Sequence, residues 1–139
     1  MNFNIKEIAH YETWDIRHQV MWPDKNIDYI KLKNDEHGLH YGLFINHNLV
    51  SVVSLFFQGK RVQFRKFATV NKQQGKGYGT ELLKAMFNKL SILNIENIWC
   101  NARKDKVSFY TNFGMEETNI QFTKGGIDYI VMEKKLVIR

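Results

Sequence analysis

Three glycines at alternate positions, Gly75, Gly77 and Gly79, lie in the segment Gln74–Thr80, which we call the glycine loop. Glycine permits positive φ angles and lets a ligand approach the backbone itself. After the loop, apolar residues recur at helical spacing over Thr80–Leu93. A helix start offers unpaired N–H groups and the positive end of the helix dipole, a combination that favours phosphate. We therefore expect the glycine loop to bind a phosphate-bearing ligand.

The spacing of these glycines excludes two common phosphate-binding motifs. A Walker loop requires Gly-x-x-x-x-Gly-Lys-Ser/Thr, but here Lys76 is followed by Gly77. A dinucleotide-binding fingerprint requires Gly-x-Gly-x-x-Gly, and this loop is one residue short between its last two glycines. The ligand is therefore expected to be a phosphate compound of another class.

Length and composition predict a single soluble domain over residues 1–139. The chain is 44% hydrophobic, which is typical of a globular protein. Cys100 is the only cysteine, so no internal disulfide can form, and a reducing cytoplasm is expected. The first residues lack the apolar core of a signal peptide, and no apolar stretch approaches the ~20 residues that span a bilayer. We expect a cytoplasmic protein with no membrane partner.

The formal net charge of +6 raises the alternative of nucleic-acid binding. The lysines are scattered rather than arranged in blocks, and no nucleic-acid recognition motif accompanies them. The densest basic group, between Lys60 and Lys76, surrounds the glycine loop. This distribution favours a small polyanionic cofactor over nucleic acid.

Hydrophobic patterning predicts a mixed α/β sheet. Strands are expected at Phe3–Ile8, Leu39–Ile45, Leu49–Phe57, Val62–Val70, Glu96–Ala102, Met115–Thr123 and Ile127–Lys135. Helices are expected at Tyr11–Met21, Ile27–Lys33, Thr80–Leu93 and Lys106–Phe113. The order is β-α-α-β-β-β-α-β-α-β-β, and the central helix should join two parallel strands.

These motifs resemble the GCN5-related N-acetyltransferase (GNAT) family, whose acetyl-CoA loop reads Gln/Arg-x-x-Gly-x-Gly/Ala. Gln74–Gly79 satisfies that pattern, and Ser108–Met115 is similar to the Phe-Tyr-x-x-x-Gly-Phe signature of the family, with Met115 in place of the aromatic residue. The element order also matches over nearly the whole chain. Arg17–Pro23 resembles a segment of a narrower group of small, uncharacterised members.

The resemblance implies a GNAT fold, acetyl-CoA as the co-substrate, no metal, and roles for specific residues. Tyr110 is implied as the general acid toward the CoA sulfur. Phe67-Ala68-Thr69 resembles the strand whose backbone pairs with the pantetheine arm, and a backbone N–H there could polarise the thioester carbonyl. The N–H groups of the loop would hold the pyrophosphate, so the expected cofactor-binding residues are Phe67, Ala68, Thr69, Gln74, Gly75, Lys76, Gly77, Tyr78, Gly79 and Thr80. Lys72 and Lys76 could add charge at the rim.

Other features leave part of the site open. Many family members carry an Asn six residues before the tyrosine, where this chain has Lys104, and Asn101 is the substitute that we assign to the cofactor. No general base stands out, because each acidic or histidine candidate is equally compatible with a surface or structural role; these candidates are Asp35, Glu36, His40, Glu116 and Glu117. A metal site on the histidines of the segment 37–47 is rejected for lack of ligand spacing. Cys100 has no partnered histidine, so direct transfer is favoured over an acyl-cysteine.

The sequence therefore predicts an acetyltransferase that moves the acetyl group of acetyl-CoA directly to an amine. A non-catalytic CoA-binding or regulatory module of the same fold is the alternative. The acceptor is expected to be a small-molecule or peptide amine, bound between Arg17–Lys33 and the last two strands near Trp14, Trp22 and Tyr29. The resemblance also allows a homodimer paired through the final strands.

Overall fold

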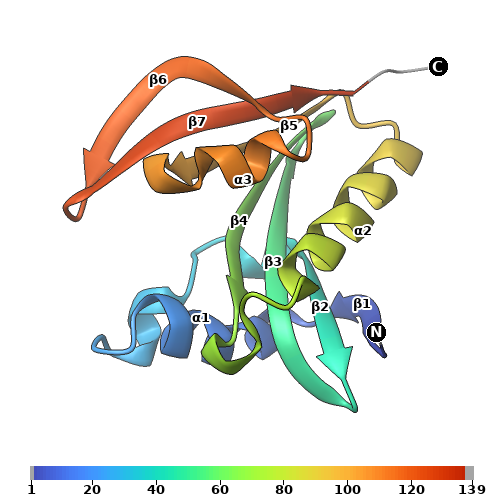
Figure 1. Ribbon diagram of the computed structural model, residues 1–139, viewed down its shortest axis with the longest axis vertical. Helices are drawn as coiled ribbons and strands as arrows, with labels where there is room; N and C mark the ends of the chain where they lie inside the picture. The colour runs from blue at the N-terminus through green and yellow to red at the C-terminus, as the bar shows by residue number, and fades with distance from the viewer. Residues whose placement is uncertain (1, 137–139) are drawn as a thin grey trace.

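A mixed seven-stranded sheet forms the centre of the molecule (Figure 1), as seen in a computed structural model that describes residues 2–136. The strands lie in the order β1-β2-β3-β4-β5-β7-β6, and all neighbouring pairs are antiparallel except β4 and β5. Their bounds are β1 (Asn4–Ile8), β2 (Leu39–Ile45), β3 (Asn48–Gln58), β4 (Arg61–Thr69), β5 (Asn97–Arg103), β6 (Glu116–Lys124) and β7 (Ile127–Lys135). The predicted strands are confirmed to within about two residues at either end, the usual precision of element boundaries.

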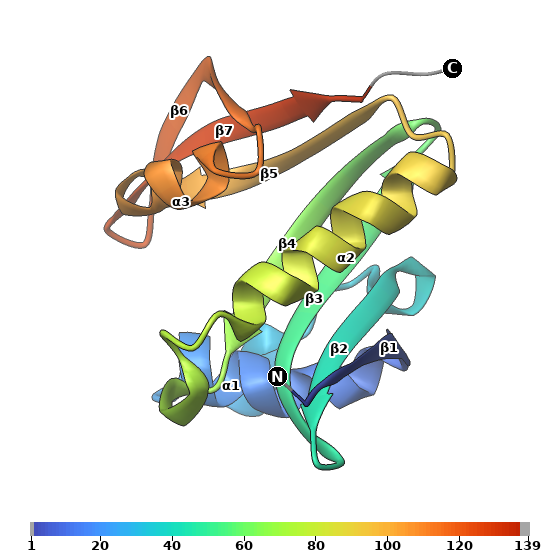
Figure 2. The same ribbon diagram turned by 45° about the vertical axis from the view of Figure 1, so that its right-hand side comes forward.

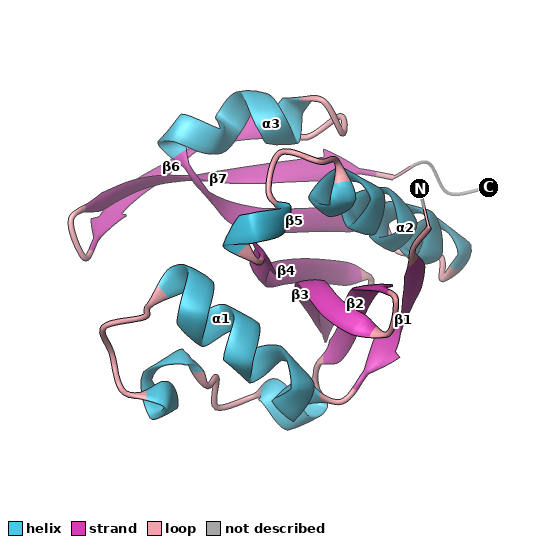
Figure 3. Cartoon of the chain, turned by 60° about the horizontal axis from the view of Figure 1, so that its bottom comes forward, coloured by secondary structure: helices cyan, strands magenta, loops and turns pink. Residues whose placement is uncertain are grey.

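Three α-helices cover the two faces of the sheet (Figure 3). The helix α1 (Trp14–Met21) lies on one face, and α2 (Tyr78–Ile92) and α3 (Val107–Thr111) lie on the other. The remaining helical segments are single 3₁₀ turns: His10–Thr13, Ile27–Ile30, Asp35–His37, Asn71–Gln73 and Lys104–Lys106. We call the two sides of the sheet the α1 face and the α2 face.

Three expected helices are shorter than the sequence pattern predicts. The segment Tyr11–Met21 is α-helical over Trp14–Met21 and begins in the 3₁₀ turn His10–Thr13. In place of a helix over Ile27–Lys33, a 3₁₀ turn spans Ile27–Ile30, because Lys31 is already extended (ψ 142°). In the segment Lys106–Phe113, the α-helical part is Val107–Thr111, preceded by a 3₁₀ turn. Short helices with few buried residues gain little from packing, which is what stabilises most helices in proteins.

Tight turns fix the register of the antiparallel pairs. Asn46 and His47 both have positive φ (48° and 70°) and join β2 to β3 as a two-residue hairpin turn. Gly125 and Gly126, with φ of 59° and 78°, join β6 to β7 in the same way. These turns connect strands that the sequence predicts at Leu39–Ile45 and Leu49–Phe57, and at Met115–Thr123 and Ile127–Lys135.

The main core lies between the sheet and α2. The helix contributes a stripe of fully buried side chains at helical spacing, Leu82, Leu83, Met86 and Leu90, and each such burial contributes roughly 1.5–3 kcal/mol. A smaller cluster under α1 contains Ile8, Ile16, Val52 and Ala68. Both faces of the central strands are therefore anchored, and α2 is held firmly where it leaves β4.

The parallel pair is the irregular part of the sheet. The expected crossover is confirmed, but β4 and β5 pair only through Arg61–Gln63 and Asn97–Trp99. Beyond Gln63 the strands separate, while β5 stays paired with β7 over its whole length. Figure 2 shows the two strands together at one end and apart at the other. The edge of β4 that faces β5 is therefore open along the second half of the strand.

Candidate functional site

A cleft of about 600 Å³ occupies the gap between β4 and β5. Its walls come from both strands, the glycine loop, α3, the end of α1 and Tyr129 of β7. This volume is within the range of small-molecule and cofactor sites. The separation of the two strands thus creates one cleft, and elements on both faces of the sheet contribute residues to its lining.

The glycine loop forms one end of the cleft and holds a left-handed backbone. Gly75 and Gly77 have φ of 77° and 87°, and Gly77 is the N-cap of α2. Gln74 braces the loop, because its Nε2 donates to the Thr69 carbonyl at 2.9 Å and to Asn71 Oδ1 at 3.1 Å. Within the described part of the chain, the N–H groups of residues 77–80 make no hydrogen bond. The loop therefore presents unpaired donors at the start of a 15-residue helix, which is a favourable place for an anion.

Gly79 has a different role from the other two glycines. A Cβ added there would lie 2.8 Å from Phe67 Cζ and 3.3 Å from Thr69 Oγ1. A side chain at position 79 would therefore clash with side chains of β4. Glycine lets the first turn of α2 lie directly against the strand, which keeps its N–H groups facing the cleft.

The second half of β4 carries a β-bulge. Val52 pairs with Ala68 and Ser54 with Arg65, so one residue of β3 faces both Lys66 and Phe67. Lys66 has a positive φ of 56°, which is uncommon for a residue other than glycine. The bulge re-aims the backbone where β4 has lost β5 as a partner, as bulges beside active sites often do.

Tyr110 lies on α3 and lines the cleft. Its ring packs near Phe64 (5.8 Å between centroids) and Phe109 (5.2 Å). Burial and the neighbouring Cys100 raise the pKa of the Tyr110 phenol above its usual 10.0, so the hydroxyl stays protonated at neutral pH. Among residues 2–136, no hydrogen bond from another side chain or the backbone involves this hydroxyl.

Cys100 also lines the cleft, but its environment makes it a poor nucleophile. The side chain is 3% exposed, and burial raises the pKa of its thiol to about 12. A thiol becomes reactive as the thiolate. Cys100 is thus a packing residue behind Tyr110.

The remaining expected cofactor residues fall into two groups. Most line the cleft: Phe67, Ala68, Thr69, Gln74, Gly75, Gly77, Tyr78, Gly79, Thr80 and Asn101. Lys76 does not, because its Nζ is directed to Gln73 Oε1 at 3.3 Å, and Lys72 also lies outside the lining. The cations that do line the cleft come instead from other elements: Arg65, Lys66, Arg103 and Lys106.

Strand alternation places Asn101 on the α1 face. Its neighbours Cys100 and Ala102 point into the core under α2, so Asn101 and Arg103 point to the opposite side. Asn101 is therefore separated from Tyr110 by the plane of the sheet. Its side chain is better placed for a ligand on the α1 face than for one beside α3.

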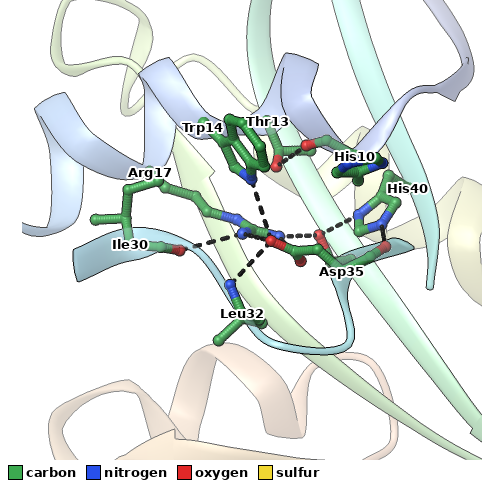
Figure 4. Close-up of polar contacts among 9 residues, drawn as sticks. His10, Thr13, Trp14, Arg17, Ile30, Leu32, Asp35 and His40 are labelled. Atoms are coloured by element: carbon green, nitrogen blue, oxygen red, sulfur yellow. Dashed lines mark hydrogen bonds and ion pairs between the residues drawn. The ribbon is translucent and has the colours of Figure 1, made fainter. Parts of the chain in front are cut away.

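A buried ion pair underlies the α1 face, and the sequence pattern did not reveal it (Figure 4). Arg17 is fully buried and forms two hydrogen bonds with the Asp35 carboxylate, at 2.8 and 2.9 Å. Asp35 also accepts from Trp14 Nε1 and from the Leu32 N–H. Burial by itself would raise the pKa of the Asp35 carboxyl, but the hydrogen bonds from Arg17 and Leu32 hold it below its usual 3.8.

His40 completes this network as a neutral side chain. Its Nε2 donates to the Asp35 carbonyl (2.8 Å), so Nδ1 accepts from Ser54 (2.7 Å), whose oxygen in turn accepts from Arg17 (2.9 Å). Burial lowers the pKa of His40 below its usual 6.5. Because its ring nitrogens are both engaged, His40 serves the fold.

The general base that the sequence left open does not appear among the acidic residues. Asp35 and His40 are locked in the buried network, and neither they nor Glu36, Glu116 or Glu117 line the cleft. No Asp, Glu or His is found among the cleft-lining residues in the described range. The region 2–136 also contains no group of three or more potential metal ligands, and no helix there is long and apolar enough to cross a membrane.

Of the three aromatic residues expected near an acceptor, only Trp22 lines the cleft. Trp14 turns to Asp35, with Nε1 at 3.1 Å from the carboxylate. Tyr29 packs edge-on against Trp22, with ring centroids 5.2 Å apart, and is 55% exposed. The α1 face of the cleft is instead formed by the end of α1, the bulge of β4 and Tyr129.

Comparisons with known proteins agree with this geometry. Residues 13–136 match the sequence profile of the "Acetyltransferase (GNAT) domain" family. The uncharacterised N-acetyltransferase YitI of Bacillus subtilis (strain 168) is 30% identical over 142 residues, covering 95% of each chain.

Solved structures share the fold at lower identity. A candidate N-acetyltransferase from Lactobacillus plantarum superimposes with a TM-score of 0.87 at 17% identity, over 99% of this chain and 100% of that one. A Bacillus subtilis acetyltransferase in complex with CoA gives a TM-score of 0.73 at 19% identity, over 98% and 99% of the two chains.

Proposed function

The chain belongs to the GNAT acetyltransferase family, and we propose that it binds acetyl-CoA in the cleft between β4 and β5 and transfers the acetyl group directly to an amine. The observation that carries the binding proposal is the row of unpaired N–H groups at residues 77–80, presented by positive-φ glycines at a helix start. The pyrophosphate of CoA is the part that this end of the cleft would hold. The bracing of the loop by Gln74 and the close approach allowed by Gly79 support the same placement.

The open edge of β4 suits the pantetheine arm. Beyond Gln63 its backbone groups on the β5 side have no strand partner, and the arm contains amide groups that can pair with such an edge, as an added strand does. Phe67, whose ring stacks on Phe109 at 6.1 Å, provides an apolar wall beside that path. We assign Phe67, Ala68 and Thr69 to this role mainly through their backbone.

Transfer requires a neutral amine, a polarised carbonyl and a proton for the departing sulfur. The amine nitrogen bonds to the acetyl carbon while the carbon–sulfur bond breaks. The backbone leaves the regular ladder at the bulge near Phe67, and we assign an N–H group there to polarise the carbonyl. Tyr110 would give its proton to the CoA sulfur and recover one from solvent, and its raised pKa ensures that the proton is present.

The proton lost by the amine has no carboxylate or imidazole acceptor in the described part of the cleft lining. We propose that the acceptor enters as the neutral amine and that its proton leaves through water. An amine with an unperturbed pKa near 10 is mostly protonated at neutral pH, so turnover should rise with pH until another group limits it.

We further propose that residues 1–139 form one domain. We also propose that the protein works in the cytoplasm, where reducing conditions keep a thiol such as that of Cys100 free. A homodimer also stays a proposal. It is supported by the position of β6 at the edge of the sheet, where Ile120 and Phe122 are exposed.

The alternative, a CoA-binding module without chemistry, is separated from the enzyme by one paired experiment. Calorimetry measures acetyl-CoA binding, and release of free thiol is followed during incubation with a panel of amines. Binding with amine-dependent thiol release is the expected result. Binding without release from any amine would favour the module, and no binding would remove the glycine loop as a CoA site.

A further inference from the structure

The charge of the cleft lining is one-sided. Four basic side chains line it, and none of the lining residues in the described range is acidic. An amine acceptor is itself a cation when protonated, so this lining repels a simple amine. The phosphates of CoA account for positive charge at the glycine-loop end, so the cations that lie away from that end are the ones available to an anionic group of the acceptor.

Strand alternation places three of these cations on the α1 side of the sheet, and two of them, Arg65 and Lys66, are adjacent in sequence and interact with each other. Arg65 follows the core residue Phe64 on β4, and Arg103 follows Ala102 on β5, so both point away from α2. Lys66 lies at the bulge, and its pKa responds to Arg65, to Arg17 under α1 and to Lys124 at the end of β6. These side chains are therefore on the opposite side of the sheet from α2, whose first turn forms the glycine-loop end of the cleft.

These cations lack partners in the protein. Arg65, Lys66 and Arg103 form no ion pair and no side-chain hydrogen bond with any residue of the range 2–136. All three are only partly exposed. Arg17, in contrast, is fully buried with Asp35 as its partner. Partly desolvated cations without a counter-charge are unfavourable, and a bound anion would compensate them.

Lys66 shows how strong this crowding is. Burial, together with the charges of Arg65, Arg17 and Lys124, lowers its pKa from 10.5 to about 8. At neutral pH the ammonium form still predominates. An anion beside Lys66 would stabilise that form and would be bound by it in return.

We propose that the acceptor is a small amine that also carries an anionic group, a carboxylate or a phosphate, held on the α1 face of the cleft by Arg65 and Lys66. This inference rests on the proposed acetyl transfer. Guanidinium groups bind carboxylates and phosphates alike in a bidentate manner. The proposal therefore specifies an oxyanion on the acceptor and leaves open which of the two it is. Polyamines and lysine-rich peptides are excluded by the same charges.

The turnover test compares acceptors that differ only in the anion. The matched pairs are O-phosphoethanolamine with ethanolamine, and L-phenylalanine with phenethylamine, each assayed by free-thiol release. We expect the anionic member of at least one pair to have a kcat/KM at least about tenfold higher than its neutral partner, since each tenfold step corresponds to one modest charge interaction. A preference for the members without the anion would overturn the proposal.

Substitution of Lys66 separates anion binding from a role as general base. Lys66→Met keeps the length of the side chain and adds no new strain at φ 56°. It should raise KM for the anionic acceptor about tenfold with little change in kcat. The matched control is Lys104→Met, an exposed lysine outside the lining, which should leave both constants unchanged. A fall in kcat with KM unchanged would contradict the proposal and indicate proton abstraction by Lys66.

A binding measurement covers the case in which no member of the panel is acetylated. With CoA at saturation, calorimetry measures O-phosphoethanolamine and ethanolamine against the wild-type chain and Lys66→Met. We expect saturable binding of the phosphate compound that weakens in the variant. Failure of the anionic probes to bind while CoA binds normally would overturn the anion site alone, whereas failure of CoA itself to bind would overturn the proposed function.

Discussion

In the proposed function, the two ends of the cleft would recognise their ligands by different means. The glycine-loop end, which we call the donor end, offers backbone N–H groups held by positive-φ glycines. The end on the α1 face, the acceptor end, offers side chains that come from β4, β5, β7 and the end of α1. Recognition by backbone N–H groups requires a contiguous segment with a particular conformation, and glycine is needed at several of its positions. Recognition by side chains can change when a single residue is substituted.

The supporting structure differs in the same way. At the donor end, Gln74 ties the loop to β4 through neutral hydrogen bonds on an exposed surface. Beneath the acceptor end, Arg17 and Asp35 form a fully enclosed ion pair that also binds Trp14 and Leu32. The predictions below test whether the two ends can be disturbed independently.

The largest effect is expected at the point where the ends meet, at Tyr110. Tyr110→Phe removes only the hydroxyl, so packing against Phe64 and Phe109 should persist. General acid catalysis contributes about 10²–10⁴-fold, and we expect turnover to fall within that range while acetyl-CoA affinity is unchanged. Stopped assays of thiol release and calorimetry on the same preparation measure the two quantities. Full activity in the variant would exclude Tyr110 as the proton donor.

The next largest effect concerns the support of the acceptor end. Arg17→Met leaves the Asp35 carboxylate buried without its cation, which costs about 3–5 kcal/mol in the free energy of unfolding. Urea unfolding measures this loss. In the double variant Arg17→Met/Asp35→Asn, the charge is removed but an oxygen remains for Trp14 and Leu32, so much of the stability should return. If both variants were equally unstable, the loss would come from packing rather than from the unpaired charge.

Most of the fold could be predicted from the sequence, because alternation and helical spacing report burial directly. The hairpin of β2 and β3 and the helix α2 follow from such patterns. The segment Ile27–Lys33 misled because a few apolar residues near a buried ion pair resemble a short amphipathic helix. There the Ile30 carbonyl accepts from Arg17 and the chain turns extended at Lys31, an outcome decided by contacts distant in sequence.

In the candidate site, too, features set by local sequence could be predicted, and features set by contacts distant in sequence could not. The glycine loop could be recognised because its residue type is required by local geometry, whereas Tyr110 was assigned from the resemblance to the GNAT family. The cations of the acceptor end could not, because their common position depends on the bulge at Lys66 and on strand alternation in two separate strands. The side chain of Lys76, a lysine within the motif, is directed to Gln73 instead of into the cleft, so the motif alone did not indicate which cations line the site.

The third prediction addresses the donor end alone. Gly77→Asp places a carboxylate where we expect pyrophosphate, and close approach of like charges costs several kcal/mol. Acetyl-CoA affinity should fall about 100-fold or more. Gly59→Asp is the matched control, because Gly59 also has a positive φ (62°) but lies in an open turn with no atom within 4 Å of an added Cβ. Equal losses of affinity in both variants would point to backbone strain instead of charge.

The smallest effect is a difference in pH response between the two ends. Between pH 7 and pH 9 the charged fraction of Lys66, whose pKa is about 8, falls from about nine-tenths to about one-tenth. The neighbouring groups that set this pKa are Arg65, Arg17 and Lys124, with Asp35 opposing them. Affinity for an anion at the acceptor end should therefore be highest below pH 8 and decline about tenfold by pH 9.

The probe for this measurement should not titrate in that range. N-acetyl-phosphoethanolamine meets the requirement, because its amide is neutral and the second pKa of a phosphate group is about 6. With CoA at saturation, its dissociation constant should rise with pH in the wild-type chain and stay flat in Lys66→Met. The dissociation constant of CoA itself should be flat in both, because the donor end binds through backbone N–H groups that do not titrate. A parallel rise for both ligands would mean that the two ends share one set of charges, and the distinction between them would fail.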